Sequence, residues 1–169
     1  QLFEHPTIAD LATVVNVADT EVVHTEQGLV TGSVELTPVQ RWFFNLSLVN
    51  PDYFNQSVVV EVPDGLSVQD WERVVGRLLE QHDGFRTRFV CVDGVWRAEM
   101  IAMPEVVSLK VVDMTSVEAD DRAELMKQVG QEVQAGLRLD SPPLLQAVLF
   151  TGWDAGGCRL LLVAHHLVV

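Results

Sequence analysis

Segments with the period of a helix alternate with segments with the period of a strand along most of this sequence, and this alternation restricts the fold to a mixed α/β class. Ser67 is a good helix cap, and the residues after it repeat their apolar side chains every three or four positions to about Gln81. Residues 85–92 and 95–101 are strand-like and flank Asp93-Gly94, a pair suited to a two-residue hairpin turn. This order of elements predicts an α/β sandwich with a mixed sheet rather than a doubly wound fold.

The same patterns predict the other elements and a division of the chain. Thr37 and Pro38 begin a helix to about Leu48, and further elements are expected as strands over 54–62, 106–112, 144–151 and 159–164 and a helix over 117–137. A short amphipathic helix after Pro6 is too short to be stable alone. Residues 17–33 hold neither period and are predicted to be a linker, although Val14, Val15 and Val17 could begin a strand. The predicted division is therefore 1–16, 17–33 and 34–169.

Charge and composition argue against several classes of partner. The 24 acidic and 11 basic residues give a formal net charge of −13, which opposes binding to nucleic acid or to an anionic membrane. The sequence has no apolar run near the ~20 residues that span a bilayer. Cys91 and Cys158 each lie in an apolar run, which predicts buried thiols and a cytoplasmic location rather than a disulfide. Gln1 and Val169 both look like cuts in a longer polypeptide.

Two histidines end the most apolar strand of the sequence. Residues 160–164 lead directly into His165 and His166. A structural role is open, because an imidazole can hydrogen-bond to backbone groups at the end of a sheet. A metal site is disfavoured, because neighbouring strand residues point to opposite faces and no Cys or carboxylate lies at ligand spacing. Catalysis is the third interpretation, since imidazole is the side chain best suited to proton transfer near neutral pH.

The histidine pair is also the start of a family resemblance. Residues 165–169 resemble the first five positions of the His-His-x-x-x-Asp-Gly motif of condensation and epimerization domains in non-ribosomal peptide synthetases, and the sequence ends one residue before the expected Asp. Other segments match motifs of the same superfamily in order: 37–43, which resembles the opening signature of epimerization domains, 54–57, 82–89 and 139–145. Residues 2–12 resemble the last helix of a peptidyl-carrier domain, although no Gly-Gly-x-Ser-type attachment site precedes them.

The resemblance implies a chloramphenicol acetyltransferase-like N-terminal lobe that acts on a thioester held by the 4'-phosphopantetheine arm of a neighbouring carrier domain. It makes His166 the catalytic acid or base and His165 a supporting residue. It also suggests that Arg86 or Arg88 pairs with the Asp expected after Val169, whereas the residues alone favour a solvated basic face for both arginines. A C-terminal lobe would supply the opposing acid or base, no covalent cofactor or metal is implied, and the chain alone is expected to be inactive.

Three other functions stay open at this point. A condensation domain would use the same second histidine, but its opening motif differs from this one, which has Val39 where Ala is expected and Trp42 where Arg is expected. That difference favours epimerization. A silent docking segment is a second alternative, and a stand-alone acyltransferase of the chloramphenicol acetyltransferase type is a third. In any of these interpretations Trp42 and Phe43 are expected on the core face of their helix, after Pro38.

Overall fold

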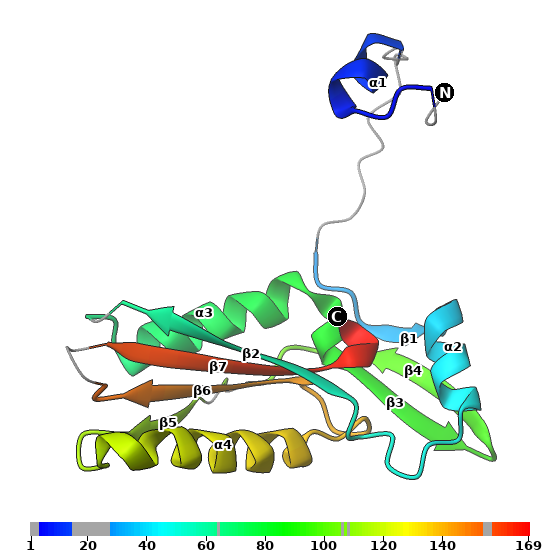
Figure 1. Ribbon diagram of the computed structural model, residues 1–169. Helices are drawn as coiled ribbons and strands as arrows, with labels where there is room; N and C mark the ends of the chain where they lie inside the picture. The colour runs from blue at the N-terminus through cyan, green and yellow to red at the C-terminus, as the bar shows by residue number, and fades with distance from the viewer. Residues whose placement is uncertain (1–3, 15–27, 64, 106, 108, 154–156) are drawn as a thin grey trace.

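Two β-sheets, the helices that pack on them and a short N-terminal helix make up the computed structural model, which describes residues 4–14, 28–63, 65–105, 107, 109–153 and 157–169 (Figure 1). The helices are α1 (Ile8–Val14), α2 (Pro38–Asn45), α3 (Val68–Gln81) and α4 (Ala119–Gly136), with the short 3-10 turns η1 (Asp83–Arg86) and η3 (His166–Val168). The strands are β1 (Gly32–Val34), β2 (Asn55–Val62), β3 (Thr87–Val92), β4 (Val95–Met100), β5 (Lys110–Asp113), β6 (Leu145–Thr151) and β7 (Cys158–His165).

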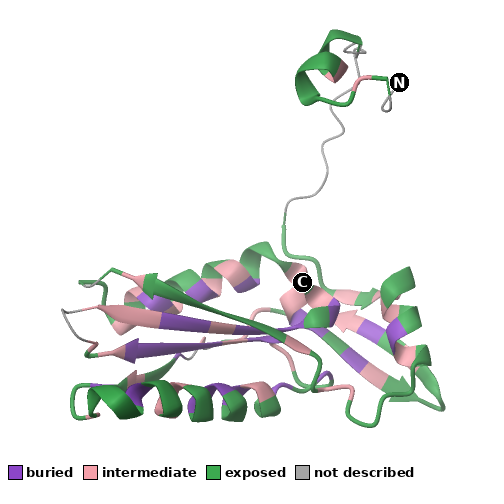
Figure 2. Cartoon of the chain, viewed as in Figure 1, coloured by how far each residue is buried: buried purple, intermediate pink, exposed green. Residues whose placement is uncertain are grey.

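The four-stranded sheet lies between α3 and α4 and confirms the predicted α/β sandwich (Figure 1). Its order is β2-β7-β6-β5, in which only the β5–β6 pair is parallel, so the sheet is mixed as predicted. Trp71, Val75 and Leu79 of α3 pack on one face of β6 and β7. Val129 and Val133 of α4 pack on the other. Figure 2 shows the result: β6 and β7 are mostly buried, whereas the outer strand β2 is largely exposed.

The three-stranded sheet is antiparallel throughout, in the order β1-β4-β3. The predicted hairpin is confirmed: Asp93 and Gly94 form its turn with φ values of 51° and 77°. A third core cluster joins this sheet to α2 and to the C-terminal turn, and its buried members are Phe43, Phe89, Ala98, Leu139, Leu144 and Leu167. The small sheet therefore supports the end of the chain that carries the two histidines.

The two helices that begin at a side-chain cap, α2 and α3, begin where the sequence predicts. Ser67 accepts a hydrogen bond from the backbone of Asp70, whose carboxylate accepts from the backbone N–H of Ser67, and α3 ends at Gln81 as predicted. Thr37 caps α2 in the same way, but α2 ends at Asn45 rather than at Leu48.

Two predicted burials are wrong. Trp42 is 57% exposed, because the eight-residue helix α2 turns only Phe43 fully into the core. Cys91 is exposed, because it lies near the Asp93-Gly94 turn of the β3–β4 hairpin, two residues from the end of the strand pair. Cys158 is half-buried against the core beside α3, closer to the expectation. The strand predicted over 106–112 is present as β5, which begins only at Lys110, and residues 106 and 108 lie outside the described residues.

The predicted division of the chain stays a prediction. Residues 8–14 form the expected short helix, α1, which buries none of its own side chains. Residues 15–27, where the predicted linker begins and where a strand was an alternative, lie outside the described residues. β1 begins at Gly32, two residues before the predicted start of the lobe at Val34. Within the described residues, no helix has both the length and the apolar character to span a bilayer.

Candidate active site

β7 ends at His165, and His166 follows it as the first residue of η3. The two neighbouring imidazoles differ sharply in burial. His165 is 0% exposed, whereas His166 is exposed at the first position of η3. The predicted placement of a histidine pair at the end of a buried strand is confirmed, and the two rings have separate roles.

His165 is a structural residue whose two ring nitrogens are both used. Its Nδ1 lies 3.2 Å from the backbone nitrogen of Leu167, which can only donate, so Nδ1 accepts. The ring proton is therefore on Nε2, which donates to the carbonyl of Pro51 at 2.8 Å. Burial lowers the pKa of His165 below its ordinary 6.5, although the Pro51 hydrogen bond and the charge of Asp52 act in the opposite direction. The neutral ring thus fastens the loop before β2 to the turn after β7.

A loss of stability in mild acid is the expected consequence of this buried neutral ring. The pKa is lower in the folded state than in the unfolded state, so the unfolded chain binds the proton more tightly. The stabilisation is complete above about pH 6.5 and is lost as the pH falls toward the folded-state pKa. Urea unfolding at pH 7.5 and pH 5.5 should show this loss in the wild type and less of it in His165→Gln. An equal loss in both proteins would contradict the assignment.

His166 has the exposure and the surroundings that a proton-transfer residue needs. Its Nε2 lies 3.1 Å from the side-chain nitrogen of Gln56 on β2, and its ring lies 5.1 Å from that of Phe54. Its backbone N–H donates to the carbonyl of Phe54 at 2.8 Å. Its partner Gln56 also lines a hollow of about 230 Å³, which His166 itself does not line, and the other lining residues are Ser57, Val58, Phe85, Leu145, Leu162, Ala164 and Val169. The ring can therefore meet a ligand from solvent.

Arg86 is completely buried, so the prediction that it shares a solvated strand face with Arg88 is wrong. Residue 86 lies in η1 rather than in a strand, which turns its side chain inward. The guanidinium forms an ion pair with Asp83 and donates to the carbonyl of Leu79 at 3.0 Å. It also donates to backbone carbonyls of residues 30 and 101. Arg86 thus connects the end of α3 with the segment before β1 and the segment after β4.

Arg88 occupies an ordinary surface position. It lies opposite Glu99 in the β3–β4 register, and the two side chains form an ion pair with 44% and 43% of their surfaces exposed. The expected pairing of Arg86 or Arg88 with an Asp after Val169 stays a prediction. The two arginines, which the sequence places only two positions apart, thus lie in very different environments.

Backbone hydrogen bonds bring the sequence motifs together around the histidines. The N–H of Leu144 donates to the carbonyl of Phe85 at 2.7 Å, and the N–H of His165 donates to the carbonyl of Leu144 at 3.1 Å. Gly84 lies against the C-terminal turn, where a Cβ would come within 3.3 Å of the carbonyl of Val168. The segments 82–89, 139–145 and 165–169 therefore form one continuous piece of structure.

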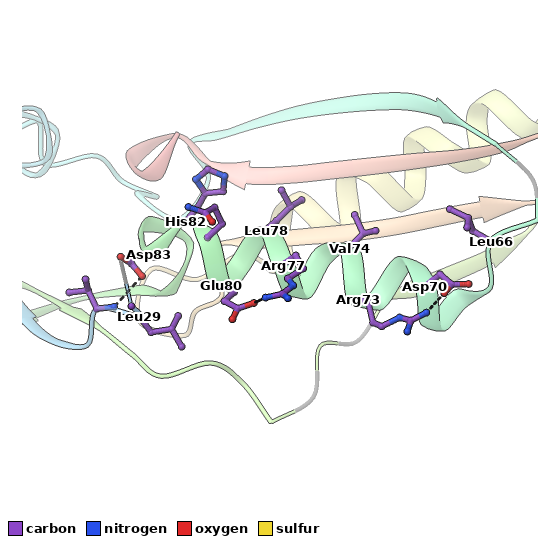
Figure 3. Close-up of a pocket in the computed structure, with 13 residues that line it drawn as sticks. Leu29, Leu66, Asp70, Arg73, Val74, Arg77, Leu78, Glu80, His82 and Asp83 are labelled. Atoms are coloured by element: carbon purple, nitrogen blue, oxygen red, sulfur yellow. Dashed lines mark hydrogen bonds and ion pairs between the residues drawn. The ribbon is translucent and has the colours of Figure 1, made fainter. Parts of the chain in front are cut away.

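A larger hollow lies elsewhere, along α3, and does not include either histidine of the pair (Figure 3). Its volume is about 920 Å³, and Leu29, Leu66, Val74 and Leu78 are among its lining residues. Its charged side chains are already paired: Arg73 with Asp70 and Arg77 with Glu80 on α3, and Asp83 with Arg86 in η1. Among the described residues, no group of three or more His, Cys, Asp or Glu side chains could hold a metal ion. The role of His166 as catalytic acid or base stays a prediction.

Comparison with known proteins agrees with this geometry. The family model of the condensation domain matches residues 30–169. One component of the linear gramicidin synthase of Brevibacillus parabrevis is 38% identical over 170 residues, which are 100% of this chain and 3% of that protein. Surfactin synthase subunit 2 of Bacillus subtilis is 33% identical over 176 residues, 99% of this chain and 5% of that protein. The chain thus spans a very small part of the relatives that it matches.

Solved structures show the same fold. The epimerization domain from the third module of tyrocidine synthetase B aligns with a TM-score of 0.73 and 26% identity, over 84% of this chain and 32% of that one. The first condensation domain of the calcium-dependent antibiotic synthetase aligns with a TM-score of 0.66 and 20% identity, over 79% of this chain and 34% of that one. The fold is therefore that of a lobe of these domains, and the chain belongs to the condensation-domain family of non-ribosomal peptide synthetases.

Proposed function

We propose that this chain is the N-terminal lobe of an epimerization domain, which inverts the α-carbon of an aminoacyl or peptidyl thioester held by a carrier domain. The observation that carries the proposal is the exposed imidazole of His166 directly after a buried strand, next to Gln56, which lines a small hollow. The ring lies where a ligand can reach it, while its buried neighbour His165 fixes the backbone that presents it.

The proposed reaction moves two protons and leaves no net change in charge. A neutral imidazole at His166 takes the proton from the α-carbon, and the electron pair of the C–H bond moves into an enolate-like thioester; in the opposite direction the protonated ring returns a proton to that carbon. Hydrogen bonds to the thioester oxygen would stabilise that negative charge. A second acid or base on the opposite side of the α-carbon completes the inversion. In the proposal this group belongs to the C-terminal lobe, and the chain alone is inactive.

Two observations support epimerization over the alternatives. The opening segment 37–43 has Val39 and Trp42 at the positions that resemble the epimerization signature. The epimerization domain of tyrocidine synthetase B also aligns with a higher TM-score and identity than the condensation domain described above, 0.73 and 26% against 0.66 and 20%.

Condensation, the formation of a peptide bond between two carrier-bound thioesters, is the second candidate. Condensation domains align over a similar share of the chain, and the same exposed imidazole could assist attack by an amine. The full-length protein with an L-aminoacyl carrier in deuterated water separates the two. Exchange of the α-proton without an acceptor supports epimerization, and amide formation without exchange would refute it.

The proposal also defines the partners and the place of action. The substrate arrives on the 4'-phosphopantetheine arm of a carrier domain, and residues 1–16 would be the last helix of such a domain, joined to the lobe by residues 17–33. The net charge of −13 supports a protein that binds neither nucleic acid nor an anionic membrane, and the free cysteines Cys91 and Cys158 support a cytoplasmic location. No covalently bound cofactor is needed by the proposed chemistry.

A further inference from the structure

The hollow of about 230 Å³ that Gln56 lines is on the α3 side of the four-stranded sheet. Two of its lining residues, Leu145 and Ala164, are 5% and 8% exposed and belong to the core cluster that α3 covers. Another, Val58 of β2, is 51% exposed. The hollow therefore has core side chains on its inner side and an open outer side, so a small group of a ligand can enter it.

The lining of this hollow favours an apolar group over a charged one. Among the described residues that line it, none has a charged side chain, and its two polar members, Gln56 and Ser57, are neutral. A charged group that entered would lose water without gaining an opposite charge, which is costly. An apolar group would gain by leaving water. Pockets of this kind, mostly apolar with a few polar groups, are typical of sites for small ligands.

The hollow is one side chain away from the exposed imidazole. Gln56 lines the hollow, and its side-chain nitrogen lies 3.1 Å from Nε2 of His166. Gln56 is itself exposed, so its amide is free to leave the ring when a substrate enters. A group that takes the place of this amide has the imidazole on one side and the hollow on the other. In the proposed reaction that group is the α-carbon, which bears the side chain of the amino acid.

We propose that the hollow holds the side chain of the residue whose α-carbon reacts, and that the substrate of this domain has an apolar, uncharged side chain. The inference rests on the proposed function, because that function places the α-carbon at His166. Val58 is the specificity-determining residue that can be tested most directly, since it is exposed at the outer side of the hollow. Alternation along β2 turns its neighbour Val59 to the opposite face of the sheet.

Exchange of the α-proton in deuterated water, catalysed by the full-length protein, tests the proposal with carriers that bear L-leucine, L-lysine or L-aspartate. For the wild type, we expect kcat/KM to be at least about 10-fold higher for the leucyl carrier than for either charged one. Val58→Asp adds a carboxylate to the hollow, so we expect the ratio of kcat/KM for leucyl to that for lysyl carrier to fall by about 10- to 100-fold.

Val59→Asp is the matched control for Val58→Asp. It adds the same charge one position along β2, at a residue that is 42% exposed and does not line the hollow. The ratio should therefore stay at its wild-type value. Val58→Lys reverses the added charge and should favour the aspartyl carrier over the lysyl one. Both positions are exposed, so none of these variants removes a side chain from the core.

Equal kcat/KM values for the three carriers in the wild type would overturn the proposal, as would a leucyl-to-lysyl ratio that Val58→Asp leaves unchanged. In the latter case, a lower free energy of unfolding for Val58→Asp than for Val59→Asp would show that another segment of the full-length protein fills the hollow. If exchange occurs without a preference for leucine, the proposed function stands and the role of the hollow fails. If exchange is absent, but amide formation shows the same preference and the same response to Val58→Asp, the proposed reaction fails and the role of the hollow stands.

Discussion

His166→Ala is expected to lower the rate of α-proton exchange in the full-length protein by about 10²- to 10⁴-fold, the range typical of a lost general acid or base. The substitution removes the only imidazole of the pair that reaches solvent, and it leaves the His165 hydrogen bonds to Pro51 and Leu167 in place. Because the lost side chain is exposed, the free energy of unfolding should change by less than about 1 kcal/mol. Rates are measured with an L-aminoacyl carrier in deuterated water.

His82→Ala is the control for His166→Ala, because it removes a different exposed imidazole. His82 is also exposed, and its ring contacts Phe85 rather than the end of β7. His82→Ala should therefore keep most of the exchange rate. If His166→Ala exchanged the α-proton at the wild-type rate, His166 would not be the acid or base. The proposed function would then be refuted as well.

Arg86→Met is expected to destabilise the fold by about 3–5 kcal/mol, as the loss of one partner of a buried ion pair does. Methionine retains much of the apolar stem but leaves Asp83 and the backbone carbonyls of Leu79 and Ile101 without the guanidinium. Unsatisfied buried acceptors are costly, because they have given up hydrogen bonds to water. Urea unfolding followed by tryptophan fluorescence measures the change.

Arg88→Met is the control for Arg86→Met, because it makes the same substitution two residues along the chain. Its ion pair with Glu99 is exposed, so we expect a loss below about 1 kcal/mol. If Arg86→Met and Arg88→Met lowered the free energy of unfolding by similar amounts, the burial of Arg86 would not explain how much it stabilises the fold. A small loss in both would show that the contacts of Arg86 are dispensable.

Periodicity and local caps were enough to predict most of the fold. α3 begins after Ser67 and ends at Gln81 as expected, because the capping box and the apolar repeat are both local properties. The Asp93-Gly94 turn is equally local. The position of His165 and His166 after a buried strand follows from an apolar run that no exposed strand would carry.

The contacts of the site could not be read from the sequence in the same way. The spacing of Arg86 and Arg88 predicted that they share one face of a strand, because a 3-10 turn has no distinctive sequence period. In the structure Arg86 lies in the 3-10 turn η1, and its side chain points inward. Gln56 and His166 are 110 positions apart, and their contact depends on the register of β2 against β7. Trp42 and Cys91 are apolar residues in regular elements, yet burial depends on what covers each face.

The outer strand β2 has a practical consequence for anyone who prepares this chain by itself. It pairs with β7 on one side, and no strand among the described residues pairs with its other side. Three consecutive valines, Val58, Val59 and Val60, are 51%, 42% and 39% exposed along it. An uncovered, β-branched edge of this kind recruits further copies edge to edge, and only mutual repulsion between strongly negative molecules opposes that aggregation. Low protein concentration and low salt are therefore the conditions under which such a preparation stays monomeric.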